Sequence, residues 1–238
     1  VNSVERMECV SKFSDEAGSS GRGKGDDSDD DSDSDSGGSE DDESEGPSDG
    51  GVSVLLGGLS SAHTFAVGYD DGRIGIFDKR AALEGGAPAV EFDKQTDFVS
   101  DLALAGPSGH QLVSSSGDGT VALFDIRKGK MVARSEDDAD DEMLSLCVMK
   151  GGKKVVCGHQ SGVIGIYSWG YWNDCSDRFP GHPGSVDTMA KVDEDVLLTG
   201  SSDGLIRIVS VLPNKALGVV GEHLADTPIE KLCLDPRQ

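Results

Sequence analysis

The sequence is poor in aromatic residues and in basic charge, and it has no long apolar run. Aromatic side chains make up 5% of the 238 residues, and 21 Lys and Arg stand against 44 Asp and Glu, a formal net charge of −23. A protein that wraps nucleic acid by bulk electrostatics needs a basic footprint, so this charge excludes that class. No apolar stretch reaches the ~18–20 residues that span a bilayer, and no secretory signal is recognisable.

Cysteine pairs and catalytic motifs are also missing. The five cysteines are scattered, odd in number and form no Cys-x-x-Cys pair, which argues against a disulfide framework and a zinc site. We expect buried, reduced thiols in a nuclear or cytosolic protein. The sequence contains no nucleophile elbow, no phosphate-binding loop and no paired-histidine metal motif, so we expect neither catalysis nor a cofactor.

Negative charge is concentrated at the start of the chain. Residues 1–50 hold 17 acidic and 4 basic side chains, and residues 26–45 read DDSDDDSDSDSGGSEDDESE. Such a segment has almost nothing to bury and cannot offset the entropy of ordering, so we expect disorder over 14–51. It is either a solvated linker or an acidic region that holds basic partners such as ribosomal proteins or histones.

Six serines of this acidic segment are candidate phosphorylation sites. They lie among carboxylates, the sequence context that an acidophilic kinase prefers, and each phosphate would add about −1.5 to −2 charges. The candidates are Ser28, Ser32, Ser34, Ser36, Ser39 and Ser44.

Four segments of the remaining chain repeat with a period of about 45 residues. Each contains a short apolar run, a turn with Asp or Ser before Gly, and a strand of alternating pattern, which together predict a β-hairpin. The hairpins span 63–80, 110–127, 153–170 and 195–212. The matching glycines are Gly72, Gly119, Gly162 and Gly204.

Further short strand candidates lie between the hairpins. The candidates before a hairpin are 98–105, 143–150 and 185–192, with 228–235 left over, and those after a hairpin are 89–92, 130–134, 177–179 and 216–220. Four strands in about 45 residues are typical of a β-propeller blade of the WD40 class. The sequence therefore predicts an all-β fold in which residues 52–238 form about four blades of a seven-bladed WD40 propeller. Residues 1–13 are expected to include a strand of a preceding blade, and the start at Val1 rather than Met suggests a fragment.

Polar side chains near the turns are interpreted as structural. Gly181-His182 lies half a repeat before Asp203, so we expect His182, Asp203 and a strand hydroxyl, from Thr199 or Ser201, to form a buried hydrogen-bond network. Asp71 and Asp118 occupy the matching turn positions, and we expect the same structural role for them.

The stretch SWGYWNDCSDRFPGHPG, residues 168–184, contains both tryptophans of the chain. It should form two loops at opposite faces of the propeller, with Trp169, Tyr171 and Trp172 near one face and His182 near the other. Two interpretations stay open. Either the rings pack on the blade, or they form an exposed patch that anchors a partner, with Arg178 as a further partner-binding candidate.

Several sequence segments resemble those of a known protein family. WGYWNDCSDRFPGHPGSVD, followed by DEDVLLTGSSDGLIRIVSVLPNKALGVVGEH, resembles the WD repeat-containing protein 55 family, and the similarity runs over residues 62–235. The resemblance implies a non-catalytic, seven-bladed propeller of the nucleus and nucleolus that serves rRNA processing and assembly of the large ribosomal subunit. An acidic tract inside a blade departs from that family's pattern, and the nucleolar role rests on analogy.

The sequence is compatible with two functions. The first is a scaffold that binds proteins, with RNA contacted only indirectly or within a particle and with no membrane or small-molecule partner. The second is the substrate receptor of a cullin-4 ubiquitin ligase, since many such receptors carry Trp-Asp-x-Arg at the end of a third strand. Phe77-Asp-Lys-Arg80 and Phe124-Asp-Ile-Arg127 match apart from the aromatic residue. Arg80 and Arg127 either contact an adaptor or form local ion pairs that contribute ~0–1 kcal/mol.

Overall fold

The computed structural model describes residues 50–59, 61–82, 87–106, 109–136, 141–223 and 227–234. The predictions for residues 1–13, for the acidic segment up to residue 49 and for its six serines lie outside this range. The chain divides into two units, Val1–Gly46 and Pro47–Gln238, and the following description concerns the second unit.

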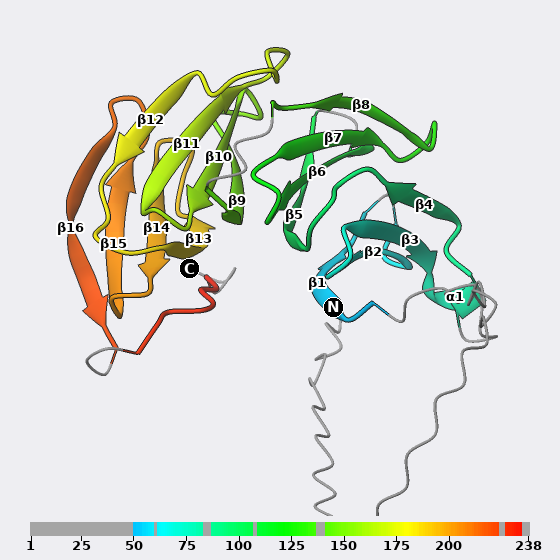
Figure 1. Ribbon diagram of the computed structural model, residues 1–238, viewed down its shortest axis with the longest axis horizontal. Helices are drawn as coiled ribbons and strands as arrows, with labels where there is room; N and C mark the ends of the chain where they lie inside the picture. Colours follow the sequence, from blue (N-terminus) through cyan, green and yellow to red (C-terminus); the bar gives the residue numbers. More distant parts are fainter. Residues whose placement is uncertain are drawn as a thin grey trace, which may run out of the picture. The chain divides into compact units, whose positions relative to one another are not determined.

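Four antiparallel sheets of four strands each form the described part of this unit (Figure 1). Blade 1 consists of β1 (Val52–Gly57), β2 (Thr64–Tyr69), β3 (Arg73–Asp78) and β4 (Val90–Asp93), with a short helix α1 (Lys79–Ala82) after β3. Blade 2 consists of β5 (Val99–Ala105), β6 (Gln111–Ser116), β7 (Val121–Asp125) and β8 (Lys130–Arg134). Blade 3 consists of β9 (Met143–Met149), β10 (Lys154–His159), β11 (Val163–Ser168) and β12 (Asp177–Pro180). Blade 4 consists of β13 (Val186–Lys191), β14 (Val196–Ser201), β15 (Leu205–Ser210) and β16 (Lys215–Glu222).

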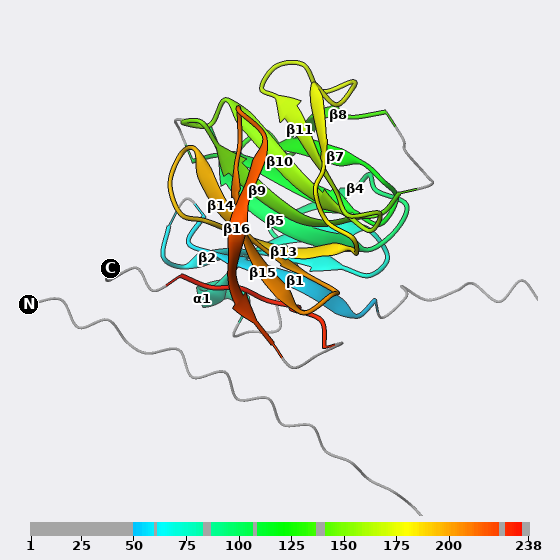
Figure 2. The ribbon, with the colours of Figure 1, turned by 90° about the vertical axis from the view of Figure 1, so that its left-hand side faces the viewer.

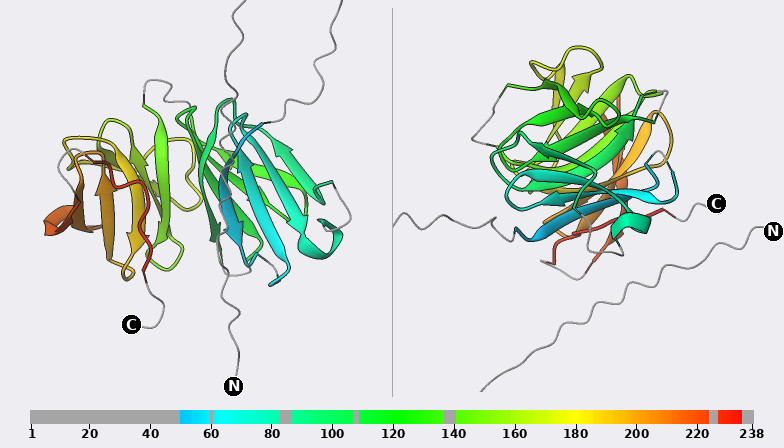
Figure 3. Two further views of the ribbon diagram at one scale, coloured as in Figure 1. Left: turned by 90° about the horizontal axis from the view of Figure 1, so that it is seen from below. Right: turned by 90° about the vertical axis from the view of Figure 1, so that its right-hand side faces the viewer.

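The blades follow one another in chain order around their first strands. Within each blade the strands pair in sequence, and β1 contacts β5, β5 contacts β9, and β9 contacts β13. The fourth strands lie at the outer edge of the unit, where β16 stands foremost in Figure 2. Figure 3 shows the same succession of sheets from below. The predicted all-β fold with four propeller blades is confirmed.

The core of the unit lies between the blades rather than within them. One apolar cluster joins blades 1 and 2, and its Phe92 and Phe124 rings have centroids 4.5 Å apart. A second cluster joins blades 2 and 3, and a third joins blades 3 and 4 around Ile164 and Leu197. Because burial of apolar surface is the main force that favours folding, each blade needs its neighbour to be stable.

Successive blades come closest where a glycine of a second strand faces a branched side chain of the following segment. The pairs are Gly68 with Val99, Gly158 with Val186, and Gly200 with Ile229. A Cβ at these glycines would lie 2.8, 2.7 and 2.5 Å from the partner side chain, closer than real Cβ contacts allow. In blade 2 the matching residue is Ser115, whose hydroxyl lies 2.8 Å from that of Ser100.

The predicted strand at 228–235 is wrong, because residues 227–234 contain no strand. The segment still lies along blade 4, where the Ile229 N–H donates to the Ser201 carbonyl at 3.2 Å. The Leu232 N–H donates to the hydroxyl of Thr188 at 3.1 Å instead of to a backbone carbonyl. A strand ladder is therefore not formed, although Ile229 occupies the place that Val99 and Val186 take in earlier blades.

Cysteine burial was predicted correctly for two residues. Cys147 and Cys157 are buried, and burial raises the pKa of the Cys147 thiol to about 11. Cys175 is half-buried and Cys233 is exposed, so the prediction is wrong for Cys233, which lies in the irregular segment 227–234. All four of these cysteines are free thiols, and Cys9 lies outside the described residues.

Replacing Gly158 by Ala should destabilise the protein. The new methyl carbon would lie 2.4 Å from the Ser145 hydroxyl and 2.7 Å from Val186 Cγ1, and overpacking of this kind costs about 1–3 kcal/mol. Gly57→Ala is the control, since a Cβ there meets nothing within 4 Å. Urea unfolding should give a clearly lower free energy of unfolding for Gly158→Ala only, and equal values for both variants would contradict the packing described.

Candidate functional site

The strand order gives the blades two different ends. In an antiparallel sheet, the turn between the second and third strands and the loop to the next blade leave the same end. We call this end the turn face; it carries the Asp-Gly turns of blades 1, 2 and 4 and the loop 181–185. The opposite end, called the pocket face, carries the turns between first and second strands and the loop 169–176. Trp169 and His182 therefore lie at opposite ends, as expected.

On the turn face, each aspartate of an Asp-Gly turn is paired with an arginine. The pairs are Asp71–Arg73, Asp118–Arg134 and Asp203–Arg207. The arginines come from β3, β8 and β15, so they have no fixed spacing from the turn, and sequence inspection missed them. Hydrogen bonds from Arg207 hold the pKa of Asp203 below its usual range. Asp203 thus stays charged, and each of the three ion pairs ties its turn to its own blade.

Asp118 is the most buried of these aspartates, with a side chain 4% exposed. One oxygen accepts hydrogen bonds from the backbone N–H and hydroxyl of Thr120, at 3.0 and 2.6 Å. The other accepts from the Thr96 N–H at 2.9 Å and from Arg134 at 3.0 Å. Asp118 therefore joins the turn, the loop between blades 1 and 2 and the outer strand β8, which agrees with the structural role predicted for it.

Blade 4 contains part of the expected network. His182 Nε2 lies 2.8 Å from the hydroxyl of Thr199, and both residues are buried. Ser201, the other candidate hydroxyl, is also buried. The expected bond between His182 and Asp203 is not formed, because Asp203 binds Arg207 and His182 Nδ1 has no hydrogen-bond partner. Burial, and then the charge of Arg207, lower the pKa of His182.

Blade 2 uses a residue that sequence reasoning missed. Gln95 is 3% exposed; its Oε1 accepts from the Ser114 hydroxyl at 2.7 Å, and its Nε2 donates to the Thr120 carbonyl at 3.3 Å. Gln95 stands four residues before Val99, just as His182 stands four residues before Val186. This equal spacing in the sequence could have identified Gln95. It places the Gln95 amide in blade 2 where blade 4 has the His182 imidazole.

In blade 3 the carboxylate lies on the loop before the first strand, and a serine occupies the turn position. Its turn carries Ser161 in place of aspartate, and the carboxylate of Asp141 accepts from the Ser161 N–H and hydroxyl at 2.9 and 2.6 Å. Buried His159 places Nδ1 3.3 Å from the same carboxylate. In each of the four blades, polar residues of the turn face therefore make contacts within the fold.

The aromatic residues of the loop 169–176 differ in exposure. Trp172 is 6% exposed and belongs to the core cluster between blades 2 and 3, so it offers no surface to a partner and is removed from the candidates. Trp169 is half-buried, with its ring edge-on to Trp172 at a centroid distance of 5.1 Å. Tyr171 is 78% exposed. The packing interpretation holds for Trp172, and partner binding by Trp169 and Tyr171 remains a prediction.

The candidate arginines are all exposed but differ in their contacts. The Arg80 guanidinium donates to Asp78 at 2.6 and 3.0 Å, a local ion pair like the one considered from the sequence. Arg127 donates only its backbone N–H to Asp125, whose carboxylate lies 3.5 Å from Lys128. Arg178 lies on β12, where its backbone N–H donates to Asp177. A partner contact of any of these side chains remains a prediction.

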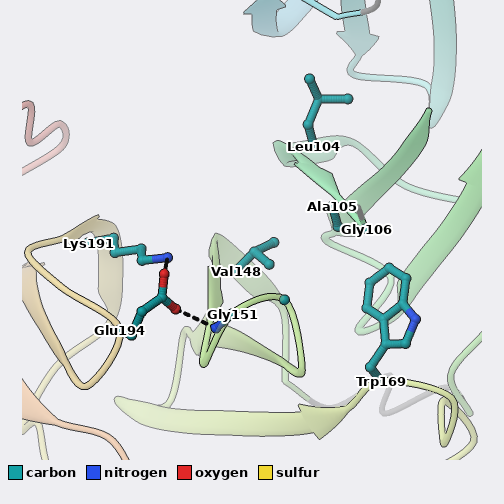
Figure 4. A pocket seen from close by; sticks show the side chains of 9 residues that line it. Leu104, Ala105, Gly106, Val148, Gly151, Trp169, Lys191 and Glu194 are labelled. Carbon is teal, nitrogen blue, oxygen red and sulfur yellow. Dashed lines mark hydrogen bonds and ion pairs between the residues drawn. The ribbon is translucent and has the colours of Figure 1, made fainter. Parts of the chain in front are cut away.

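The pocket face contains a cavity of about 480 Å³ between blades 2, 3 and 4 (Figure 4). Leu104 and Gly106 line it from the end of β5, Val148 from β9 and Trp169 from the loop after β11. Lys191 and Glu194 close the opposite side. Only one of these lining residues, Trp169, was proposed from the sequence, because the cavity depends on how three blades meet.

The described residues contain no group of three or more His, Cys, Asp or Glu side chains that could hold a metal ion. Among these same residues, no helix has the length and apolar character needed to cross a membrane.

A family model described as WD domain, G-beta repeat matches residues 86–125 and 173–210. Each match runs from the fourth strand of one blade to the third strand of the next. One solved structure, titled "Crystal Structure of Mitotic Checkpoint Complex", has a chain that aligns with a TM-score of 0.56 at 18% identity. The alignment covers 67% of this chain and 49% of that chain, and it indicates the fold alone.

Curated proteins give a more specific similarity. WD repeat-containing protein 55 of Arabidopsis thaliana is 42% identical over 172 residues, 72% of this chain and 46% of that protein. The human protein of the same name is 38% identical over 77% of this chain and 45% of its own length. WD repeat-containing protein JIP5 of Malassezia globosa is 38% identical over 69% of this chain and 46% of its length. The chain spans about half the length of these relatives.

His182→Gln should keep the fold and weaken its dependence on pH. Since the folded protein lowers the pKa of His182, the unfolded chain takes up the proton first, and stability is lost as pH falls below about 6.5, the usual histidine value. A glutamine can accept from Thr199 as Gln95 accepts from Ser114. Urea unfolding between about pH 5 and 8 should show a flatter profile for the variant, and parallel profiles would contradict this assignment.

Proposed function

Because the chain belongs to the WD repeat-containing protein 55 family, we propose that it is an interaction scaffold that acts in ribosome biogenesis in the nucleolus. Its tasks would be rRNA processing and assembly of the large subunit. The observation that carries the proposal is the similarity to that family over about 70% of the chain. The partners are proteins, and contact with RNA is indirect or within a particle.

The charge of the chain supports a basic partner. The net charge of −23 would attract the basic proteins of a ribosomal precursor and speed their association. The propeller would supply rigid surfaces, since its blades are fixed by apolar clusters between them and by ion pairs at the turns. Binding to a rigid surface avoids the cost of ordering loops at the interface.

Arg127 favours a second candidate function, that of a substrate receptor for a cullin-4 ubiquitin ligase. It ends the phrase Phe124-Asp-Ile-Arg127 on the pocket face, and its exposed guanidinium makes no ion pair within the described residues. Arg80 ends the matching phrase in blade 1 but binds Asp78. The second candidate therefore depends mainly on Arg127.

Sedimentation of the full-length, tagged protein distinguishes these functions. In nuclear extract on a sucrose gradient, a scaffold of ribosome assembly should migrate with large-subunit precursors and shift to lighter fractions after RNase treatment. Arg80→Ala and Arg127→Ala together should leave that migration unchanged, as should the exposed control Lys215→Ala. Migration as a small complex with a cullin adaptor, lost only in the double arginine variant, would contradict the assembly scaffold and support the ligase receptor.

A further inference from the structure

One wall of the pocket between blades 2, 3 and 4 is apolar and partly open to solvent. Leu104, Val148 and Trp169 form it, each half-buried. The floor is the turn Gly151-Gly152, where a Cβ at either residue would meet nothing within 4 Å. Large apolar side chains therefore form one side of a space of about 480 Å³.

This wall is fixed in place before any partner binds. The Trp169 N–H donates to the Lys153 carbonyl at 2.9 Å, and the Trp169 ring packs edge-on against buried Trp172. The Glu136 N–H donates to the Asn173 carbonyl at 2.9 Å and so holds the same loop against blade 2. A preformed cavity of this size suits one or two side chains of a partner.

The other wall is charged. Glu194 accepts from Lys191 and, at 2.5 Å, from the N–H of Gly151, and these bonds lower the pKa of Glu194. Next to it, Lys150 lies 2.5 Å from Asp195. The Glu194 carboxylate therefore remains ionised at neutral pH.

In both ion pairs the carboxylate is the more exposed partner. The side chain of Glu194 is 53% exposed against 34% for Lys191, and that of Asp195 is 71% exposed against 19% for Lys150. Glu194, which lines the pocket, and the adjacent Asp195 thus expose their carboxylates to solvent more fully than Lys191 and Lys150 expose their side chains.

We propose that this pocket binds an aliphatic or aromatic side chain of an extended, lysine- or arginine-rich segment of a partner protein. The apolar wall of Leu104, Val148 and Trp169 takes the side chain, which acts as the buried anchor of the interface. Glu194 at the pocket and Asp195 next to it attract the flanking basic residues, and the Trp169 ring offers a face for a cation. The inference rests on the proposed function in one respect, the expectation of a basic partner.

The test uses a small set of fluorescein-labelled peptides of eleven residues and the full chain. The central residue is Leu, Phe or Ser, and the flanks are rich in Lys or in Glu. Fluorescence polarisation should detect binding of the Lys-flanked Leu and Phe peptides, with the Ser peptide weaker by about 10-fold or more. The Glu-flanked peptides should not bind. Failure of every peptide to bind the wild-type protein would overturn the proposal.

Three variants locate the binding. Val148→Asp should weaken binding by about 10-fold or more, whereas Val132→Asp, an exposed position on β8 outside the pocket, should not. Asp195→Lys reverses an exposed charge without touching the core, so it should weaken the Lys-flanked peptides and strengthen the Glu-flanked ones. If neither Val148→Asp nor Asp195→Lys changed the affinity for the peptides, the binding site would lie elsewhere and the proposal would be contradicted.

The outcome is separable from that of the proposed function. Co-sedimentation with pre-ribosomal particles without peptide binding would overturn only the pocket assignment. Peptide binding that depends on Val148 and Asp195, in a protein that does not co-sediment, would overturn only the ribosomal role.

Discussion

The structure depends on the close approach of each blade to the next segment, and at one position of the second strand three of the four blades have a residue without a side chain. At Gly68, Gly158 and Gly200 the neighbouring segment places Val99, Val186 and Ile229 where a Cβ would otherwise lie. In blade 2 the position is Ser115, and its hydroxyl lies against that of Ser100. The apolar faces of adjacent sheets meet beside these contacts, and the buried clusters form there.

The turn face shows how one structural requirement is met by different side chains. A buried hydrogen bond to a strand hydroxyl comes from Gln95 in blade 2 and from His182 in blade 4. Blade 3 places its carboxylate, Asp141, on the loop instead of the turn. Because an unpaired buried hydroxyl is costly, Ser114 and Thr199 each have a partner, although the two blades supply it from different side chains.

The repeat could be predicted from the sequence because it depends on local patterns. Turns with Asp or Ser before Gly, together with alternating strands, predicted the four hairpins, and the spacing of the hairpins predicted the blades. The arginine partners of Asp118 and Asp203 could not be predicted, because they come from different strands and their distance depends on the packed sheet. The burial of Trp172 and the pocket beside Trp169 depend likewise on contacts between blades.

The candidate partner-binding surface around Trp169 also depends on contacts between blades. The Trp169 loop is held against blade 2 by the bond from Glu136 to Asn173 and lies at the pocket formed with blade 4. An interaction scaffold of this kind needs no moving part, because its neighbouring blades fix the geometry of the cavity. Its charge then selects among partners, since the carboxylates of Glu194 and Asp195 are more exposed than the lysines that pair with them.

Between consecutive blades a glycine and a branched side chain share one space, and a double-mutant cycle at Gly68 and Val99 measures whether they do. The free energies of unfolding of Gly68→Ala, Val99→Gly and the double variant would be measured in urea. Val99→Gly removes both Cβ and Cγ1, the two Val99 atoms that would lie 2.8 Å from the new methyl carbon. The double variant should lose less stability than the two single variants together, by about 1 kcal/mol or more, because the new methyl group fills the space that the Val99 side chain leaves. Additivity within about 0.5 kcal/mol would contradict the claim.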